Sequence, residues 1–216
     1  MKPVFDILCN VQDRDLGSVA AAIEKKLEPL RKKLPPLYRI NVSGQVTSMN
    51  SAFQQLGFGI VFAIILVYLL MVINFQSWRE PFIILTGLPI AACGVLWMLF
   101  LTRTTFNVPS LMGILMAIGV TSSNSILLIT FANQRLREGL GPLEASIEAG
   151  TIRFRPILMT ATAMIIGMLP MSLGLTEGGE QYMPLGRAVI GGLLIGTLGT
   201  LFFVPSMFTT IRQGKK

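Results

Sequence analysis

Five apolar stretches, each about as long as a membrane-spanning helix, constrain this chain more than any other feature of its sequence. A helix needs about 20 predominantly apolar residues to cross the hydrocarbon core of a bilayer. The alternative is a core helix of a soluble protein that happens to recur five times. We favour the first interpretation, so the sequence predicts an α-helical membrane protein with five transmembrane helices. The predicted spans are residues 56–75, 82–101, 109–131, 156–175 and 188–211.

The basic residues are distributed by side of the membrane. Eight of the eighteen Lys and Arg residues precede residue 40, and most of the others flank the spans on alternate sides. Because cytoplasmic loops carry the excess of Lys and Arg, we expect residues 76–81, 132–155 and the C-terminus in the cytoplasm. The segment before the first span then lies in the periplasm of a Gram-negative cell. The net charge of +7 reflects this topology, and we expect no nucleic-acid partner.

The charged segment between the third and fourth spans contains apolar residues spaced among its charges. This pattern predicts short amphipathic helices that lie on the cytoplasmic surface of the membrane. Pro156 is then expected in the first turn of the helix that follows, where the missing N–H of a proline does no harm.

Residues 1–50 have the pattern of a soluble fold. Alternating apolar residues predict strands in 3–11 and 37–44, and apolar residues three and four apart predict a helix between them. A β-α-β unit of about 45 residues buries little apolar surface, so we expect its sheet to take strands from elsewhere. A small cap packed on the membrane domain is the alternative. Because no cleavable signal sequence precedes this exported segment, we also expect further sequence upstream.

Polar residues lie at mid-depth of the third predicted span and at the cytoplasmic mouth of the fourth, where lipid disfavours them. Residues 121–125 read Thr-Ser-Ser-Asn-Ser at mid-span, and Arg153 and Arg155 precede the fourth span. Such groups usually face other helices, water or a transported species. Interhelical hydrogen bonding alone is one explanation for Asn124, and contact with lipid headgroups is one for the two arginines. The functional alternative is a path for protons or water.

Small residues recur every four positions along two spans. This spacing places them on one helix face and allows a second helix to approach closely, more plausibly within the bundle than between two copies of the chain. The predicted helix-packing residues are Gly113 and Ala117 on the third span, and Ala188, Gly192 and Gly196 on the fifth.

The composition restricts the chemistry of the chain. All eleven Asp and Glu residues lie outside the predicted spans, although a proton-driven carrier needs a titratable group within the membrane. Because His is absent and Cys9 and Cys93 are the only cysteines, we expect no metal site, no cofactor and no disulfide. An intramembrane protease would have only weak serine-based options. We therefore expect no enzyme, and a chain that cannot complete a proton relay by itself.

Seven stretches, taken in order, resemble the permeases of the resistance–nodulation–division (RND) family, specifically the C-terminal end of the multidrug-efflux branch. The resemblance covers essentially the whole chain and implies a permease with about twelve spans and two large periplasmic loops. Residues 1–50 would be part of a ferredoxin-like porter subdomain, and residues 51–216 the last five spans. The stretches are VQDRDLG, GQVTSMNS, VYLLMVINFQSWREPF, SNSILLITFA, RFRPILMT, GMLP and FFVP.

The resemblance also implies a proton relay. In the family, paired aspartates of the N-terminal half work with a lysine on the helix that matches the third span, and with an arginine and a threonine on the next helix. Arg153 and Thr160 match that arginine and threonine, whereas Ser123, directly before the matching Asn124, replaces the lysine. Thr130 similarly replaces an acidic residue that is common in drug-exporting relatives. A serine cannot pair ionically with aspartates, so either the relay is rebuilt or the coupling differs.

The sequence thus predicts the C-terminal portion of a proton-driven RND efflux permease that exports toxic or amphiphilic compounds. The implied setting is a homotrimeric antiporter in the bacterial inner membrane. Its expected partners are an N-terminal permease half that carries the relay acids, a periplasmic adaptor, an outer-membrane channel and membrane lipid. A truncated or structural membrane subunit without transport of its own is the alternative.

Overall fold

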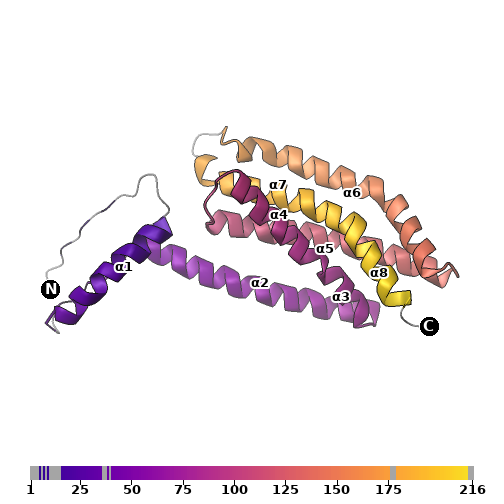
Figure 1. Cartoon of the computed structure of the whole chain (residues 1–216), viewed down its shortest axis with the longest axis horizontal. Coiled ribbons are helices and arrows are strands. Elements are labelled where there is room, and N and C mark those ends of the chain that lie inside the picture. Colours follow the sequence, from indigo (N-terminus) through magenta and orange to yellow (C-terminus); the bar gives the residue numbers. More distant parts are fainter. Residues whose placement is uncertain are drawn as a thin grey trace. The chain divides into compact units, whose positions relative to one another are not determined.

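The computed structural model of the chain describes residues 5, 7, 9, 16–35, 38, 40–175 and 179–213. It divides into two compact units, residues 1–55 and 56–216. All regular elements among the described residues are helical (Figure 1). In chain order they are α1 (Leu16–Lys33), α2 (Gln45–Phe75), α3 (Arg79–Leu85), α4 (Gly87–Leu101), α5 (Val108–Arg137), α6 (Pro142–Ser172), η1 (Gly179–Gln181), α7 (Met183–Leu198), η2 (Gly199–Phe203) and α8 (Val204–Gln213).

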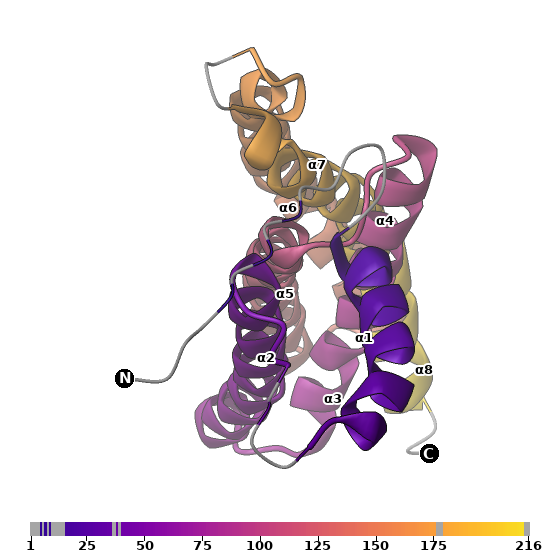
Figure 2. The same ribbon diagram turned by 90° about the vertical axis from the view of Figure 1, so that its left-hand side faces the viewer.

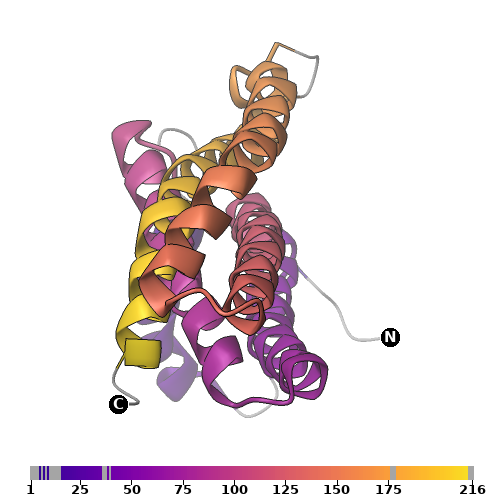
Figure 3. The same cartoon turned by 90° about the vertical axis from the view of Figure 1, so that its right-hand side faces the viewer.

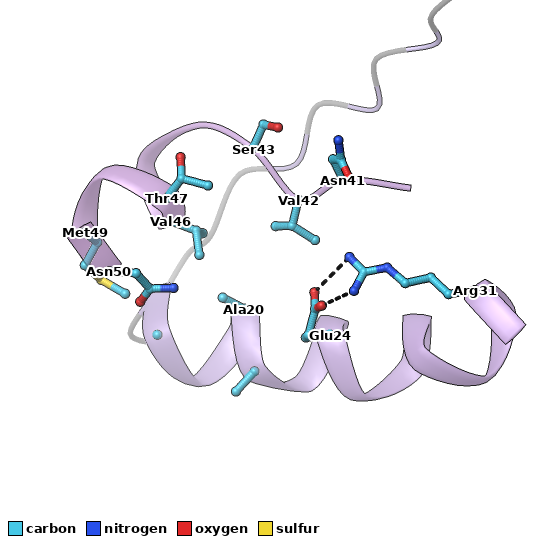
Figure 4. A pocket seen from close by; sticks show the side chains of 12 residues that line it. Ala20, Glu24, Arg31, Asn41, Val42, Ser43, Val46, Thr47, Met49 and Asn50 are labelled. Carbon is cyan, nitrogen blue, oxygen red and sulfur yellow. Dashed lines mark hydrogen bonds and ion pairs between the residues drawn. The ribbon is translucent and has the colours of Figure 1, made fainter. Parts of the chain in front are cut away.

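In its described part, the first unit consists of α1, the segment after it and the beginning of α2. The predicted helix between the two strands is present as α1, but none of its residues is buried. Arg31 forms an ion pair with Glu24, and its Nε donates a hydrogen bond to the carbonyl oxygen of Ile40 at 3.1 Å. Figure 4 shows this ion pair in a groove that Asn41 and Asn50 also line.

Within the described residues, the predicted β-α-β unit is not seen. Residues 38 and 40–42 of the second predicted strand are not in a sheet, and the first predicted strand lies outside the described residues except at positions 5, 7 and 9. A strand needs neighbours to satisfy its backbone hydrogen bonds, and one or two strands alone are marginally stable.

The second unit is a bundle of long apolar helices. Among the described residues, five helical segments are long and apolar enough to cross a membrane, in agreement with the five apolar helices predicted from the sequence. The first of these segments is a single helix, whereas the second consists of two helices, α3 and α4. They are Val46–Phe75, Arg79–Leu101, Val108–Arg137, Pro142–Ser172 and Met183–Arg212.

The helices extend beyond the apolar windows at their charged ends. α5 continues to Arg137 and α6 begins at Pro142, so residues 138–141 alone connect them. The prediction of short surface helices between these spans is therefore wrong, and Pro156 lies inside α6 rather than in its first turn. The reason is that backbone hydrogen bonding continues where charged side chains are solvated, so low hydropathy does not end a helix.

The first turn of α5 is fixed by a capping box. The side chain of Asn107 accepts a hydrogen bond from the Ser110 N–H at 3.0 Å, and the Asn107 N–H donates to the Ser110 hydroxyl at 2.8 Å. Pro109 lies in this turn, where no intrahelical hydrogen bond is lost.

Helix α7 packs against α4, α5 and α6 (Figures 1, 2 and 3). Its approach to α4 is very close, because a Cβ atom on Gly94 would lie 2.6 Å from the carbonyl oxygen of Gly191. The last span is interrupted by η2, a π-helical turn whose Thr200 is fully buried. Its hydroxyl donates to the carbonyl oxygen of Gly196 at 3.0 Å, which satisfies it inside the apolar bundle.

The two ends of the bundle differ in charge. At one end, which we call the charged end, α3 begins, α5 ends, α6 begins and α8 ends. Its basic residues include Arg79, Arg135, Arg137 and Arg212. At the opposite end, Arg187 donates to the Thr104 hydroxyl at 2.7 Å and to the carbonyl oxygen of Ser172 at 3.2 Å, and so joins three segments.

Candidate functional site

Arg153 lies on the face of α6 that meets α5, close to the charged end. Its Cζ is 5.5 Å from the centre of the Phe131 ring, and the Cζ of Arg135 is 5.1 Å from the same ring. Two guanidinium groups therefore share one aromatic ring in cation–π contacts. Arg135 also forms ion pairs with Glu138 at 2.6 Å and with Glu148 at 3.1 Å. Arg153 forms no ion pair with any described residue, so the charge of Arg135 is matched and that of Arg153 is not.

The Nε of Arg153 is buried and finds no hydrogen-bond acceptor within the described part of the chain. The Nε of Arg135 shares this feature, but carboxylates bind other nitrogens of that guanidinium. A buried donor on a charged group is unfavourable without an acceptor. The arrangement thus leaves Arg153 ready to bind an acidic or other hydrogen-bond-accepting group.

Asn124 lies on the same face of α5 as Phe131 and Arg135, because intervals of seven and four residues bring side chains into one line on a helix. The side chain of Asn124 is buried, whereas the preceding Ser123 is exposed. The structure therefore directs Asn124 into the helix bundle and leaves Ser123 on a surface that no other described residue covers.

Thr160 lies on α6, two turns beyond Arg153, and is exposed. Its hydroxyl is within hydrogen-bond distance of two carbonyl oxygens of its own helix, those of Pro156 at 3.2 Å and Ile157 at 3.0 Å. No hydrogen bond in the described structure joins any two of Ser123, Asn124, Arg153 and Thr160. These four predicted relay residues lie on two neighbouring helices, but they do not form a connected network in this chain.

An ion pair that the sequence analysis missed joins three helices at the charged end. Glu80 lies in the first turn of α3 and is 6% exposed, and its Oε1 is 2.5 Å from Nη2 of Arg212 in α8. The same nitrogen donates to the side-chain oxygen of Asn133 in α5 at 3.1 Å. Sequence separation conceals this contact, since Glu80 and Arg212 are 132 positions apart.

Three acids that lie outside the predicted spans belong to the helices of the bundle, namely Glu80 in α3 and Glu144 and Glu148 in α6. Glu80 and Glu148 already have arginine partners. Glu138, just beyond the third span, accepts a hydrogen bond from Arg135, and this bond holds the pKa of its carboxyl below the usual value. None of the described acids is thus paired with Arg153.

A regular ladder of small residues joins α5 to α7. A Cβ atom on Gly113 would lie 2.6 Å from the Ala188 Cβ, and one on Gly192 would lie 2.5 Å from the Ala117 Cβ. Gly196 faces Thr121 in the same way, at 2.6 Å from its hydroxyl oxygen. Each pair is separated by 75 positions, so the two helices run parallel.

The ladder ends in a polar contact. The hydroxyls of Ser125 and Thr200, again 75 positions apart, lie 3.3 Å from one another. Part of the polar stretch 121–125 therefore serves the α5–α7 interface. In the described residues, no three His, Cys, Asp or Glu side chains gather in a way that could hold a metal ion.

Comparison with known proteins identifies the family of this chain. The AcrB/AcrD/AcrF family matches residues 1–212. The swarming motility protein SwrC of Bacillus subtilis (strain 168) is 38% identical over 217 residues, which cover 100% of this chain and 20% of SwrC. The multidrug resistance protein MdtC of Erwinia tasmaniensis is 37% identical over 194 residues, which cover 89% of this chain and 19% of MdtC.

A solved structure agrees with these matches. The X-ray crystal structure of a heavy metal efflux pump superposes with a TM-score of 0.78 and 30% identity, over 94% of this chain and 20% of that one. The chain thus spans about a fifth of the length of the relatives that it matches. The chain belongs to the AcrB/AcrD/AcrF family, and the RND efflux permease family predicted from its motifs is confirmed.

Proposed function

We propose that this chain supplies the last five spans of a proton-driven RND efflux permease that exports toxic or amphiphilic compounds. In this proposal residues 1–50 belong to a ferredoxin-like porter subdomain in the periplasm, and residues 51–216 form the membrane part. The C-terminus lies in the cytoplasm, since the charged end carries the excess of arginine.

The observation that carries the proposal is the unmatched guanidinium of Arg153. It is held by the Phe131 ring, its Nε is buried without an acceptor, and the nearby carboxylates of Glu138 and Glu148 are bound to Arg135. A charge kept in this state within a membrane protein usually marks a transport pathway or a missing partner. Both descriptions suit a relay whose aspartates come from the N-terminal half of the permease.

The exposed positions of Ser123 and Thr160 support the same assignment. In the complete permease these surfaces of α5 and α6 would face the spans that carry the aspartates. Ser123 holds no charge, so in our proposal the lysine of related pumps is replaced by hydrogen bonding through Ser123 and the neighbouring Asn124. Arg153 then provides the positive charge that stabilises the ionised acids.

The assembly and the substrates are also part of the proposal. We infer a homotrimer in the inner membrane that works with a periplasmic adaptor and an outer-membrane channel. The relatives carry names that refer to multidrug resistance, swarming motility and heavy-metal efflux. We favour amphiphilic organic substrates, because the sequence motifs resemble the multidrug branch.

The test replaces Arg153 in the permease that carries this chain. Arg153→Ala should abolish drug export, measured as resistance of a pump-deficient strain and as dye efflux, while the amount and size of the assembled permease stay unchanged. Arg137→Ala is the matched control, since Arg137 is an exposed arginine of the same bundle end. Export that survives Arg153→Ala at the level of the control would remove Arg153 from the mechanism.

A structural subunit without transport of its own remains the second candidate. It is favoured by one observation, namely that none of the described acids forms an ion pair with Arg153. Co-expression with the first seven spans of a related permease separates the two. Restored resistance supports a working permease, and no restoration together with normal assembly supports the structural role.

A further inference from the structure

A groove of about 660 Å³ runs between the first half of α6 and the segment formed by η2 and α8. Its walls contain two large aromatic side chains, Phe154 and Phe202, which are 46% and 68% exposed. Gly150 forms part of its floor, and a Cβ atom there would meet no atom within 4 Å. Most of the groove surface is apolar, and the groove is large enough for part of an organic ligand.

One cation lines the groove. Arg155 is exposed and forms no hydrogen bond or ion pair with the described residues. A long side chain on a helix is directed toward the N-terminus of that helix, which in α6 is the charged end. This rule places the guanidinium of Arg155 between the groove and the charged end of the bundle.

Two hydroxyls add hydrogen-bond acceptors. Thr151, one turn before Arg155, donates to the carbonyl oxygen of Ile147 at 2.9 Å, and Ser206 donates to that of Phe202 at 2.7 Å. Their protons are engaged with their own helices, so each oxygen offers lone pairs to the groove. The groove therefore combines apolar walls, one unpaired cation and acceptors for a ligand that bears hydroxyl groups.

We propose that this groove binds an anionic phospholipid of the cytoplasmic leaflet, with the phosphate on Arg155 and an acyl chain along Phe154 and Phe202. Basic pockets between transmembrane helices on this side of a membrane are suited to anionic headgroups. A hydroxyl-bearing headgroup, such as that of phosphatidylglycerol, would donate to the Thr151 and Ser206 oxygens. The proposal requires membrane insertion of the chain, but it does not depend on the transport activity.

The walls argue for lipid rather than for another helix of the permease. Where α7 meets α4 and α5 most closely, the contacts are built from small residues, as in the Gly113–Ala188 pair. The groove instead presents exposed phenylalanines and an arginine without a partner, which suit acyl chains and a headgroup.

Native mass spectrometry of the whole permease tests the proposal. The protein is offered equal amounts of phosphatidylglycerol and phosphatidylcholine, and the lipid that stays bound is measured. Arg155→Ala should weaken phosphatidylglycerol retention roughly fivefold, the effect of one arginine near an anionic lipid, with little effect on phosphatidylcholine. Arg155→Lys should keep the preference, because a lysine ammonium also binds phosphate.

Gly150→Leu should reduce retention of both lipids, since its side chain fills the groove. Two variants serve as matched controls and should behave as the original protein. Arg137→Ala removes another exposed arginine of the charged end, and Gly167→Leu adds the same side chain to α6 at a second position with open space around it.

Three results would overturn the proposal. The first is unchanged phosphatidylglycerol retention in Arg155→Ala and Gly150→Leu. The second is displacement of bound phosphatidylglycerol by soluble glycerol phosphate as readily as by added phosphatidylglycerol. This result would show that the groove is a site for free phosphate and that acyl chains add nothing to binding. The third is loss of trimer assembly in Gly150→Leu but not in Gly167→Leu, which would show that protein fills the groove.

Discussion

Adding one methyl group at Gly113 should push α5 and α7 apart. In the structure a Cβ atom on Gly113 would lie 2.6 Å from the Ala188 Cβ and 3.0 Å from the Leu185 carbonyl oxygen. Two carbon atoms pack best at about 3.5–4.0 Å, so Gly113→Ala creates an overlap of about 1 Å between two packed helices. The backbone on both sides is helical, and neither side chain has a rotamer that avoids the contact.

Two opposing effects set the size of the loss. Overpacking of this kind costs about 1–3 kcal/mol, and we expect the upper part of that range because the contact involves two helix backbones. Replacement of Gly by Ala within a helix stabilises that helix by about 1 kcal/mol. The free energy of unfolding of the purified permease in a denaturing detergent titration should therefore fall by about 1–2 kcal/mol.

The second-site variant Ala188→Gly makes the reasoning refutable. It removes the opposing methyl group, so the double variant should recover most of the stability that Gly113→Ala loses. Gly119→Ala on the same helix is the control and should not destabilise, because its Cβ meets no atom within 4 Å. Equal stability of Gly113→Ala and the original protein, or a loss that Ala188→Gly does not relieve, would refute the assigned α5–α7 packing.

Two further predictions concern the charged end. Arg212→Ala leaves the buried Glu80 without its partner and should lower the free energy of unfolding by about 3 kcal/mol in the same titration, whereas a loss below about 1 kcal/mol would contradict a stabilising role. The folded-state pKa of Glu138 lies below its unfolded value because Arg135 hydrogen-bonds it, so this pair stabilises the protein above the unfolded pKa and ceases to do so as the pH falls through the folded pKa. Glu138→Gln should therefore be less stable than the original at neutral pH, with a difference that disappears as the pH falls through the lowered folded-state pKa of Glu138, and a difference independent of pH would exclude this linkage.

The spans were predictable from sequence because each depends on local composition. Windows of apolar residues located all five, but they did not locate the helix ends, as the continuation of α5 to Arg137 and the interior position of Pro156 show. Hydropathy reports where lipid is tolerated, whereas helix ends depend on backbone hydrogen bonding and caps. The π-helical turn at Gly199–Phe203 depends on packing around Thr200, for which the sequence has no local signal.

The candidate site was predictable only as a list of residues. Asn124 stood out because polar groups are rare in spans, and Arg153 stood out because it precedes a span and matches the arginine of the family's relay. The two cation–π contacts of Phe131, with Arg135 on its own helix and Arg153 on the next, depend on how two helices pack. The sequence of either helix alone therefore could not predict them. Glu80 was treated as a loop acid, because nothing near it in the sequence identifies Arg212 as its partner.

The distance between Arg153 and the nearest carboxylate in the complete, assembled permease tests the central claim most directly. A high-resolution structure of that assembly should show a carboxylate oxygen from a span outside this chain within about 4 Å of the Arg153 guanidinium in at least one protomer. If every protomer instead shows Arg153 facing lipid headgroups, with no acid near Ser123, Asn124 or Thr160, the proposed relay is wrong.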